Sequence, residues 1–196
     1  MVNYAEDADF RPRKRKNPRE IAERKAARAA ARSASDWRSL ARDVVYRRLA
    51  VRDRSVAELR ASLEKELVPE EFISETIQKF ADANLVDDER FANGFVRARF
   101  ESKVISRKAL AHDLHKKGIV GERAEEALGQ ISDEDEQERA NAFAVRKIRS
   151  MARFEPEVIK RRLFGALARR GFSPGQVMRA VEAAFESLGS DQADHR

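Results

Sequence analysis

Residues 106–119 read SRKALAHDLHKKGI, and related stretches occur at residues 55–68 (SVAELRASLEKELV) and 159–172 (IKRRLFGALARRGF). The leucines Leu59, Leu110 and Leu163 align, at spacings of 51 and 53 residues, and each is followed by another leucine four residues later. Agreement continues at the aligned sets Leu67, Gly118 and Gly171; Val68, Ile119 and Phe172; Ile73, Ala124 and Val177; and Ile77, Leu128 and Val181. This pattern indicates a tandem repeat of about 50 residues.

Each repeat is expected to contain three helices, because apolar residues recur at helical spacing and are separated by turn signals. The first helices are predicted at 36–51, 88–102 and 136–152, the second at 55–66, 106–117 and 156–170, and the third at 69–82, 121–131 and 174–187. Ser55, Ser106 and Ser173 are predicted N-caps, and Ser35 with Asp36 is expected to cap the first helix. Gly118 and Gly171 follow pairs of basic residues where a helix ends in a left-handed residue. Leu67 takes the corresponding place in the first repeat, so that turn is expected to differ.

Ala, Leu, Arg and Glu dominate the sequence, and only five Pro and eight Gly interrupt it, which favours an all-α fold. Three short helices bury little core alone, so neighbouring repeats should stack into an elongated, curved array. The expected organisation is a basic N-terminal arm that is disordered or a fraying helix (1–34), three three-helix repeats (35–86, 87–133 and 134–188) and a C-terminal tail (189–196).

Three further features have structural interpretations. Trp37 and Tyr46 lie on or beside an apolar stripe and are expected in the core. In the polar cluster Asp87–Glu89 an aspartate is expected to cap the following helix. The repeat pattern does not explain the acidic stretch Ser132–Glu138, which we interpret as a linker.

Several classes of function are disfavoured. The chain has no cysteine, so disulfides, thiolate catalysis and cysteine-based zinc sites are excluded. It has no phosphate-binding glycine loop and no nucleophile elbow, so we predict a non-enzymatic protein without a cofactor. For His112 and His115 we favour a solvated or capping role over a metal site. The first ten residues lack the apolar run of a signal peptide, and no stretch is long and apolar enough to cross a membrane. We therefore expect a cytoplasmic monomer that does not bind membranes.

Charge is unevenly distributed along the chain. Residues 1–42 hold 12 Lys and Arg against 6 Asp and Glu, which accounts for the whole net charge of +6. Residues 122–138 carry eight acids and one base, whereas residues 139–179 carry eleven bases and two acids. A surface polarised in this way suits an acidic partner such as nucleic acid.

The candidate binding residues are therefore basic. In the second and third repeats they are Arg97, Arg99, Lys103, Arg107, Lys108, Lys116, Lys117, Arg146, Lys147, Arg149, Arg153, Lys160, Arg161, Arg162, Arg169 and Arg170. In the arm, Arg13, Lys14, Arg15 and Lys16 are candidates for nonspecific phosphate contact through counterion release. An arm that serves only solubility is the alternative.

The stretch LVDDERFA at residues 85–92, followed by Phe95, Arg97 and Arg99, resembles the signature that joins the first two repeats of RecX proteins. Ser55, Leu59 and the turns ending in Gly118 and Gly171 are similar to other parts of that family, and the resemblance covers about residues 40–188. It implies a regulator that binds RecA and its filament on single-stranded DNA and lies along the filament groove. Such a protein restrains ATP hydrolysis, strand exchange and repressor cleavage, and so acts in homologous recombination, DNA repair and the SOS response.

Two other functions stay open. Three-helix units with basic second helices resemble helix-turn-helix domains, so the chain could act as a stand-alone DNA-binding protein. Against this, no helix carries the cluster of Asn, Gln or Arg that base readout requires. A helical scaffold with a solubilising arm is the other alternative. Weak direct DNA binding is compatible with the RecA-binding hypothesis.

Overall fold

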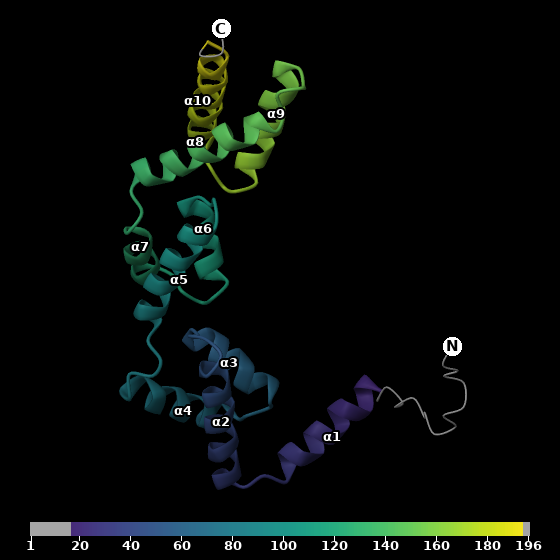
Figure 1. The fold of residues 1–196 in the computed structure, drawn as a ribbon. Coiled ribbons are helices and arrows are strands. Elements are labelled where there is room, and N and C mark those ends of the chain that lie inside the picture. The colour runs from purple at the N-terminus through teal and green to yellow at the C-terminus, as the bar shows by residue number, and fades with distance from the viewer. Residues whose placement is uncertain (1–16, 194–196) are drawn as a thin grey trace, which may run out of the picture.

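The computed structural model describes residues 17–193, with side chains described up to residue 189. Within this range there are ten helices and no strand (Figure 1), which confirms the predicted all-α fold. The helices are α1 Pro18–Ala30, α2 Ala34–Leu49, α3 Val56–Lys65, α4 Glu70–Asp82, α5 Asp88–Ser102, α6 Arg107–His115, α7 Glu122–Leu128, α8 Asp133–Arg149, α9 Pro156–Ala168 and α10 Pro174–Ala193. No helix in this part of the chain has the length and apolar character of a bilayer span.

Helices α2–α4, α5–α7 and α8–α10 each surround a separate hydrophobic core. The aligned leucines Leu59, Leu110 and Leu163 are fully buried at the centres of these cores. Each repeat that the leucine spacing indicates therefore has a hydrophobic core of its own. The boundary at residue 86 stays a prediction, which the separate cores support. The boundary at residue 133 also stays a prediction, although α8 of the third repeat already begins at Asp133.

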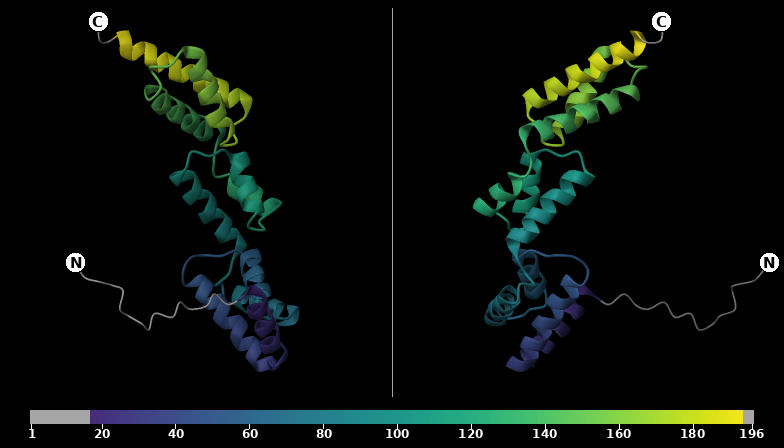
Figure 2. Two further views of the ribbon diagram at one scale, coloured as in Figure 1. Left: turned by 90° about the vertical axis from the view of Figure 1, so that its right-hand side faces the viewer. Right: turned by 60° about the vertical axis from the view of Figure 1, so that its left-hand side comes forward.

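The three groups of helices are stacked end to end in a curved array, seen from three directions in Figures 1 and 2. The second helices of the repeats, α3, α6 and α9, lie on the inner side of the arc in Figure 1, whereas α4 and α7 lie on its outer side. The surface most exposed to a partner within the arc is therefore built mainly from the second helices.

The helix caps agree with the prediction at three of four places. The hydroxyl of Ser55 accepts a hydrogen bond from Glu58 N, and those of Ser106 and Ser173 act in the same way at α6 and α10. The first repeat differs, because Ser33 and not Ser35 is the N-cap of α2 and forms a reciprocal capping box with Asp36. Asp36 thus takes part in the cap from the third helical position.

The acidic stretch Ser132–Glu138 is part of a helix, so its interpretation as a linker was wrong. Ser132 caps α8 and forms a capping box with Asp135. Four acidic residues occupy the first turn of α8, where the helix dipole favours negative charge. The first helix of the third repeat therefore begins at Asp133, three residues before its predicted start.

The turn after the second helix has the same backbone conformation in all three repeats. Gly118 and Gly171 have φ values of 75° and 89°, and Leu67 has a φ of 60°. The expectation that Leu67 makes this turn different was wrong as regards the backbone. Leu67 is exposed, whereas each glycine is pressed against the preceding repeat.

Helix α1 lies within the arm. The arm was expected to be disordered or a fraying helix, and residues 18–30 are helical. Residues 1–16 lie outside the described part of the chain, and with them the candidate phosphate contacts Arg13, Lys14, Arg15 and Lys16.

Candidate functional site

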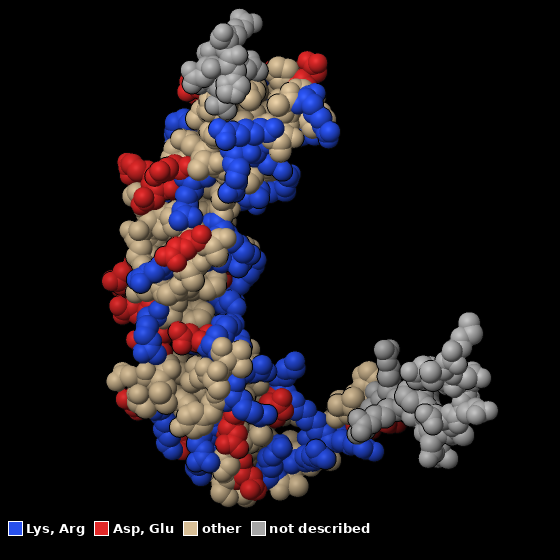
Figure 3. All heavy atoms as spheres, viewed as in Figure 1, with Lys and Arg blue, Asp and Glu red and all other residues tan. Residues whose placement is uncertain are grey.

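Basic and acidic residues are concentrated on opposite sides of the arc in Figure 3. Lys and Arg side chains line its inner side next to α6 and α9. Asp and Glu side chains are frequent on the outer side, beside α7 and the start of α8. The uneven charge of the sequence thus becomes a basic concave surface in three dimensions.

A cleft between the second and third repeats brings together five of the predicted residues. Its volume is about 580 Å³, and no carboxylate is among the residues that line it. We call this site the basic cleft, and its cations are Arg99, Lys103, Arg146, Arg169 and Arg170. Lys103 follows α5, Arg146 lies on α8, and Arg169 and Arg170 follow α9. The site is therefore formed by residues that are up to 71 positions apart in the sequence.

The five cations of the basic cleft differ in how they are held. Arg99 donates to the Asp113 carboxylate at 3.1 Å. The Arg170 guanidinium lies 4.2 Å from the centre of the Phe143 ring and donates to a backbone carbonyl in α9. Among the described residues, Lys103, Arg146 and Arg169 have no ion-pair partner. These three charges are available to a ligand that carries phosphate or carboxylate groups.

Other predicted residues have partners within the protein. Arg107 forms an ion pair with Asp133 at 2.8 Å, and Lys117 with Glu58 at 2.7 Å. Both pairs join one repeat to the next. Lys116 is paired with Asp113 and Lys160 with Glu157. These residues are weaker candidates for binding, since a partner must compete with an existing carboxylate.

The remaining predicted residues lie outside the basic cleft. Arg153 and Arg162 both approach the Phe154 ring, at 5.1 and 4.1 Å. The rest are exposed on α5, α6, α8 and α9, namely Arg97, Lys108, Lys147, Arg149 and Arg161. No predicted site residue in the described part of the chain is buried.

The junction between the first and second repeats depends on close backbone packing. The buried Ser55 hydroxyl donates to the Lys117 carbonyl at 2.7 Å. Gly118 lies against α3 so closely that an added Cβ would be 2.3 Å from the Cβ of Ala57. Burial raises the pKa of Glu58, but hydrogen bonds from Arg52 and Lys117 outweigh it and lower that pKa to about 2.

The junction between the second and third repeats is similar, but a backbone N–H replaces the serine hydroxyl as the donor. The backbone N–H of Ser106 donates to the Arg170 carbonyl at 3.0 Å. An added Cβ at Gly171 would be 2.4 Å from the Ser106 hydroxyl oxygen and 2.8 Å from the Cβ of Ala109. Positive φ favours glycine at this turn, although Leu67 adopts it too. Contact with the preceding repeat is what excludes a larger residue at Gly171.

Sequence reasoning missed the carboxylates that join the repeats. Asp88 accepts a hydrogen bond from Val56 N at 2.8 Å, and the buried Glu136 accepts one from Arg107 N at 3.0 Å. Each carboxylate thus caps a second helix of the preceding repeat. Asp87 caps its own helix α5, as predicted for this cluster. The long-range role of Asp88 and Glu136 has no local signal, because the capped helix is about 30 residues away in the sequence.

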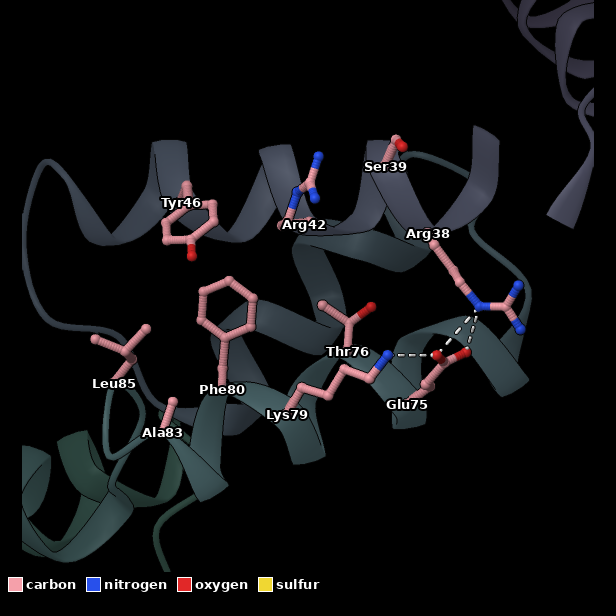
Figure 4. A pocket seen from close by; sticks show the side chains of 10 residues that line it. All are labelled: Arg38, Ser39, Arg42, Tyr46, Glu75, Thr76, Lys79, Phe80, Ala83 and Leu85. Atoms are coloured by element: carbon pink, nitrogen blue, oxygen red, sulfur yellow. Dashed lines mark hydrogen bonds and ion pairs between the residues drawn. The ribbon is translucent and has the colours of Figure 1, made fainter. Parts of the chain in front are cut away.

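A second hollow, of about 360 Å³, lies between α2 and α4 (Figure 4). Tyr46 lines it with 52% of its surface exposed, so the prediction that Tyr46 lies in the core was wrong, whereas Trp37 is buried. The Tyr46 ring meets Phe80 edge-on at 4.9 Å. Glu75 is bound by both Lys79 and Arg38, so this hollow contains a carboxylate that pairs with two of its cations, unlike the basic cleft.

His112 and His115 lie exposed on α6. In the described residues, no three or more His, Asp or Glu side chains are grouped as a metal site would require. The interpretation of these two histidines as solvated or capping side chains stays a prediction.

The sequence and fold of this chain are similar to those of known RecX proteins. Residues 87–128 match the family model described as RecX, second three-helix domain, and residues 133–181 match RecX, third three-helix domain. The protein named Regulatory protein RecX from Streptomyces coelicolor is 34% identical over 151 residues, which cover 77% of this chain and 80% of that protein. The protein of the same name from Mycobacterium bovis is 32% identical over 168 residues, which cover 84% of this chain and 95% of that protein. The crystal structure of RecX from Lactobacillus salivarius aligns with a TM-score of 0.69 at 23% identity, over 76% of this chain and 97% of that one, and supports the fold.

Proposed function

This chain belongs to the RecX family of regulatory proteins, and on that premise we propose that it binds RecA and the RecA filament on single-stranded DNA. In this proposal the inner side of the arc docks along the filament groove. Binding restrains the recombinase, ATPase and coprotease activities of RecA. The protein acts as a monomer and by binding, without a catalytic step of its own.

The observation that carries the proposal is the basic cleft on a curved body. Lys103, Arg146 and Arg169 are cations without an ion-pair partner in the described chain, and the cleft around them contains no carboxylate. Charges of one sign in a concave site attract a partner of opposite sign and accelerate its association. A filament made of DNA and protein offers phosphates and acidic side chains along a helical groove, and a curved array can follow such a groove.

The test is the rate of ATP hydrolysis by the cognate RecA on single-stranded DNA, with this protein added from far below equimolar. We expect substoichiometric amounts to lower the rate, because a bound regulator acts on a filament of many subunits. The double variant Arg146→Glu, Arg169→Glu should require at least ten times more protein for the same inhibition. The variant Arg123→Glu is the matched control, since Arg123 is exposed on α7 at the outer side of the arc.

Two results would contradict the proposal. If the wild-type protein changes neither the rate nor the length of the filaments, it does not restrain RecA. If the cleft variant inhibits as well as the control, the basic cleft is not the contact surface, and the function must be carried by another surface.

Direct binding to DNA is the second candidate, and the same basic cleft favours it, because phosphates of free DNA are also anions. The two functions differ in the target that binds more tightly. Strong binding to naked DNA with a steep dependence on salt supports the stand-alone function. Weak binding to DNA together with tight binding to the RecA filament supports the proposed one.

A further inference from the structure

Helix α1 does not belong to any of the three repeats and buries no residue of its own. A helix of 13 residues without a buried face is marginal in water. A few contacts with the first repeat hold it, among them the partly buried Ala29, which packs against the core of that repeat. Lys25 forms an ion pair with Glu66 at 3.0 Å and donates a hydrogen bond to the Lys65 carbonyl, and Arg32 lies 4.8 Å from the Trp37 ring centre.

Most basic residues of α1 lie on a different face of the helix from its acidic residues. Ile21, Arg24, Lys25, Arg28 and Arg32 follow helical spacing and line a groove of about 340 Å³ together with Glu66. We call this site the α1 groove. Its four cations face a single carboxylate, which is already paired with Lys25.

The acidic residues of α1 do not enter the groove. Glu20 and Glu23 are not among the residues that line it, and Glu23 is paired with Arg19. Arg24 and Arg28 are exposed, and no described residue pairs with either. One face of the helix therefore presents uncompensated positive charge to the groove.

The position of α1 relates this groove to the inner side of the arc. In Figure 1 the helix projects from the base of the first repeat toward the open side of the arc. Figure 3 shows Lys and Arg side chains continuing from the first repeat along this projection. A long anionic partner on the inner side of the arc can thus extend to α1.

We propose that the α1 groove binds the phosphate backbone of single-stranded nucleic acid, with Arg24 and Arg28 as the contacting residues. Successive arginines one turn apart on a helix lie about 6 Å apart along its axis, so they can contact phosphates of one strand in series. The sequence immediately before α1 adds five bases and no acid between Arg11 and Lys16. Such a run favours nucleic acid over an acidic protein surface, because nucleic-acid-binding arms have this composition. The inference rests on the proposed function only for the path of the strand along the arc.

The experiment measures binding of the full-length protein to a fluorescein-labelled 30-nucleotide oligodeoxythymidylate by fluorescence anisotropy at several KCl concentrations. We expect Arg24→Glu, Arg28→Glu to weaken binding at least tenfold. The slope of log affinity against log salt should fall by about 1.4, since each single-strand phosphate contact contributes about 0.7. The matched variant Arg24→Lys, Arg28→Lys retains both charges and should bind within threefold of wild type. Neither substitution removes a buried side chain, so both variants should fold.

The cleft variant Arg146→Glu, Arg169→Glu separates this inference from the proposed function. If the α1 variant binds the oligonucleotide like wild type while the cleft variant binds it less tightly, the groove assignment is wrong. The function proposed for the basic cleft is then unaffected. If the α1 variant binds the oligonucleotide normally but binds the RecA filament less tightly, the groove contacts acidic protein and the nucleic-acid assignment is overturned. Failure of the wild-type protein to bind the oligonucleotide at 50 mM KCl also overturns it, whereas the ATPase assay still tests the proposed function.

Discussion

Replacing Gly118 by alanine should weaken the junction between the first and second repeats. Alanine at the positive φ of Gly118 costs about 1–2 kcal/mol. The new Cβ would overlap the Cβ of Ala57 at 2.3 Å, so the two backbones must move apart. That movement breaks the buried hydrogen bond from Ser55 to the Lys117 carbonyl, at a cost of about 1–3 kcal/mol. We expect Gly118→Ala to lower the free energy of unfolding by about 3 kcal/mol in total.

Trp37 gives a direct assay for this variant. It is the only tryptophan of the chain and lies buried in the core of the first repeat, so its fluorescence in a urea titration reports that repeat. Ala57→Gly removes the atom with which the new methyl group collides. The double variant should therefore be more stable than the sum of the single effects predicts, by about 1–2 kcal/mol. Additive effects of Gly118→Ala and Ala57→Gly would refute the close-contact argument and leave only the backbone term.

Substitutions at three further positions test the turns and the junction carboxylates, each by urea unfolding against wild type. Leu67→Gly should stabilise the first repeat by about 1 kcal/mol, because leucine is strained at positive φ and contacts no preceding repeat; a loss of stability would contradict this. Glu58→Gln should cost about 1–2 kcal/mol at pH 7. Since the lowered pKa favours folding only while Glu58 is ionised, this difference should disappear as the pH falls from 4.5 toward about 2, and a constant difference would exclude the ion pairs as its cause. Glu136→Ala should cost about 1–3 kcal/mol and Glu136→Gln less, because the amide oxygen still accepts from Arg107 N; equal losses would point to charge instead.

The features that sequence analysis predicted correctly are those with local causes. Leu59, Leu110 and Leu163 mark the cores because a helix returns to the same face every three to four residues. Ser55 and Ser106 were identified as caps because a cap and the N–H groups that it satisfies are adjacent in the chain. Local rules are therefore sufficient for most of the helices and for their order.

The errors arose where two rules competed or where distant segments meet. Ser33 and Ser35 both suit an N-cap, and only the reciprocal bond with Asp36 distinguishes them. Tyr46 follows the apolar stripe of its helix, yet it lies at the edge of the core, where it lines the hollow between α2 and α4 with about half of its surface exposed. The basic cleft could not be predicted as a group, because Lys103 and Arg169 meet only through the packing of one repeat on the next.

The two junctions share their backbone geometry but differ in charge, and one aligned pair of residues explains the difference. Alignment of the repeats places Glu58 opposite Ala109, and Lys117 opposite Arg170. At the first junction Glu58 neutralises Lys117 at 2.7 Å. At the second, Ala109 lines the cleft without a carboxylate, and the Arg170 guanidinium stacks on Phe143. The missing acid leaves the second junction positively charged. The same repeat position therefore forms an ion pair between the first two repeats, as Glu58, and lines a candidate binding site between the next two, as Ala109.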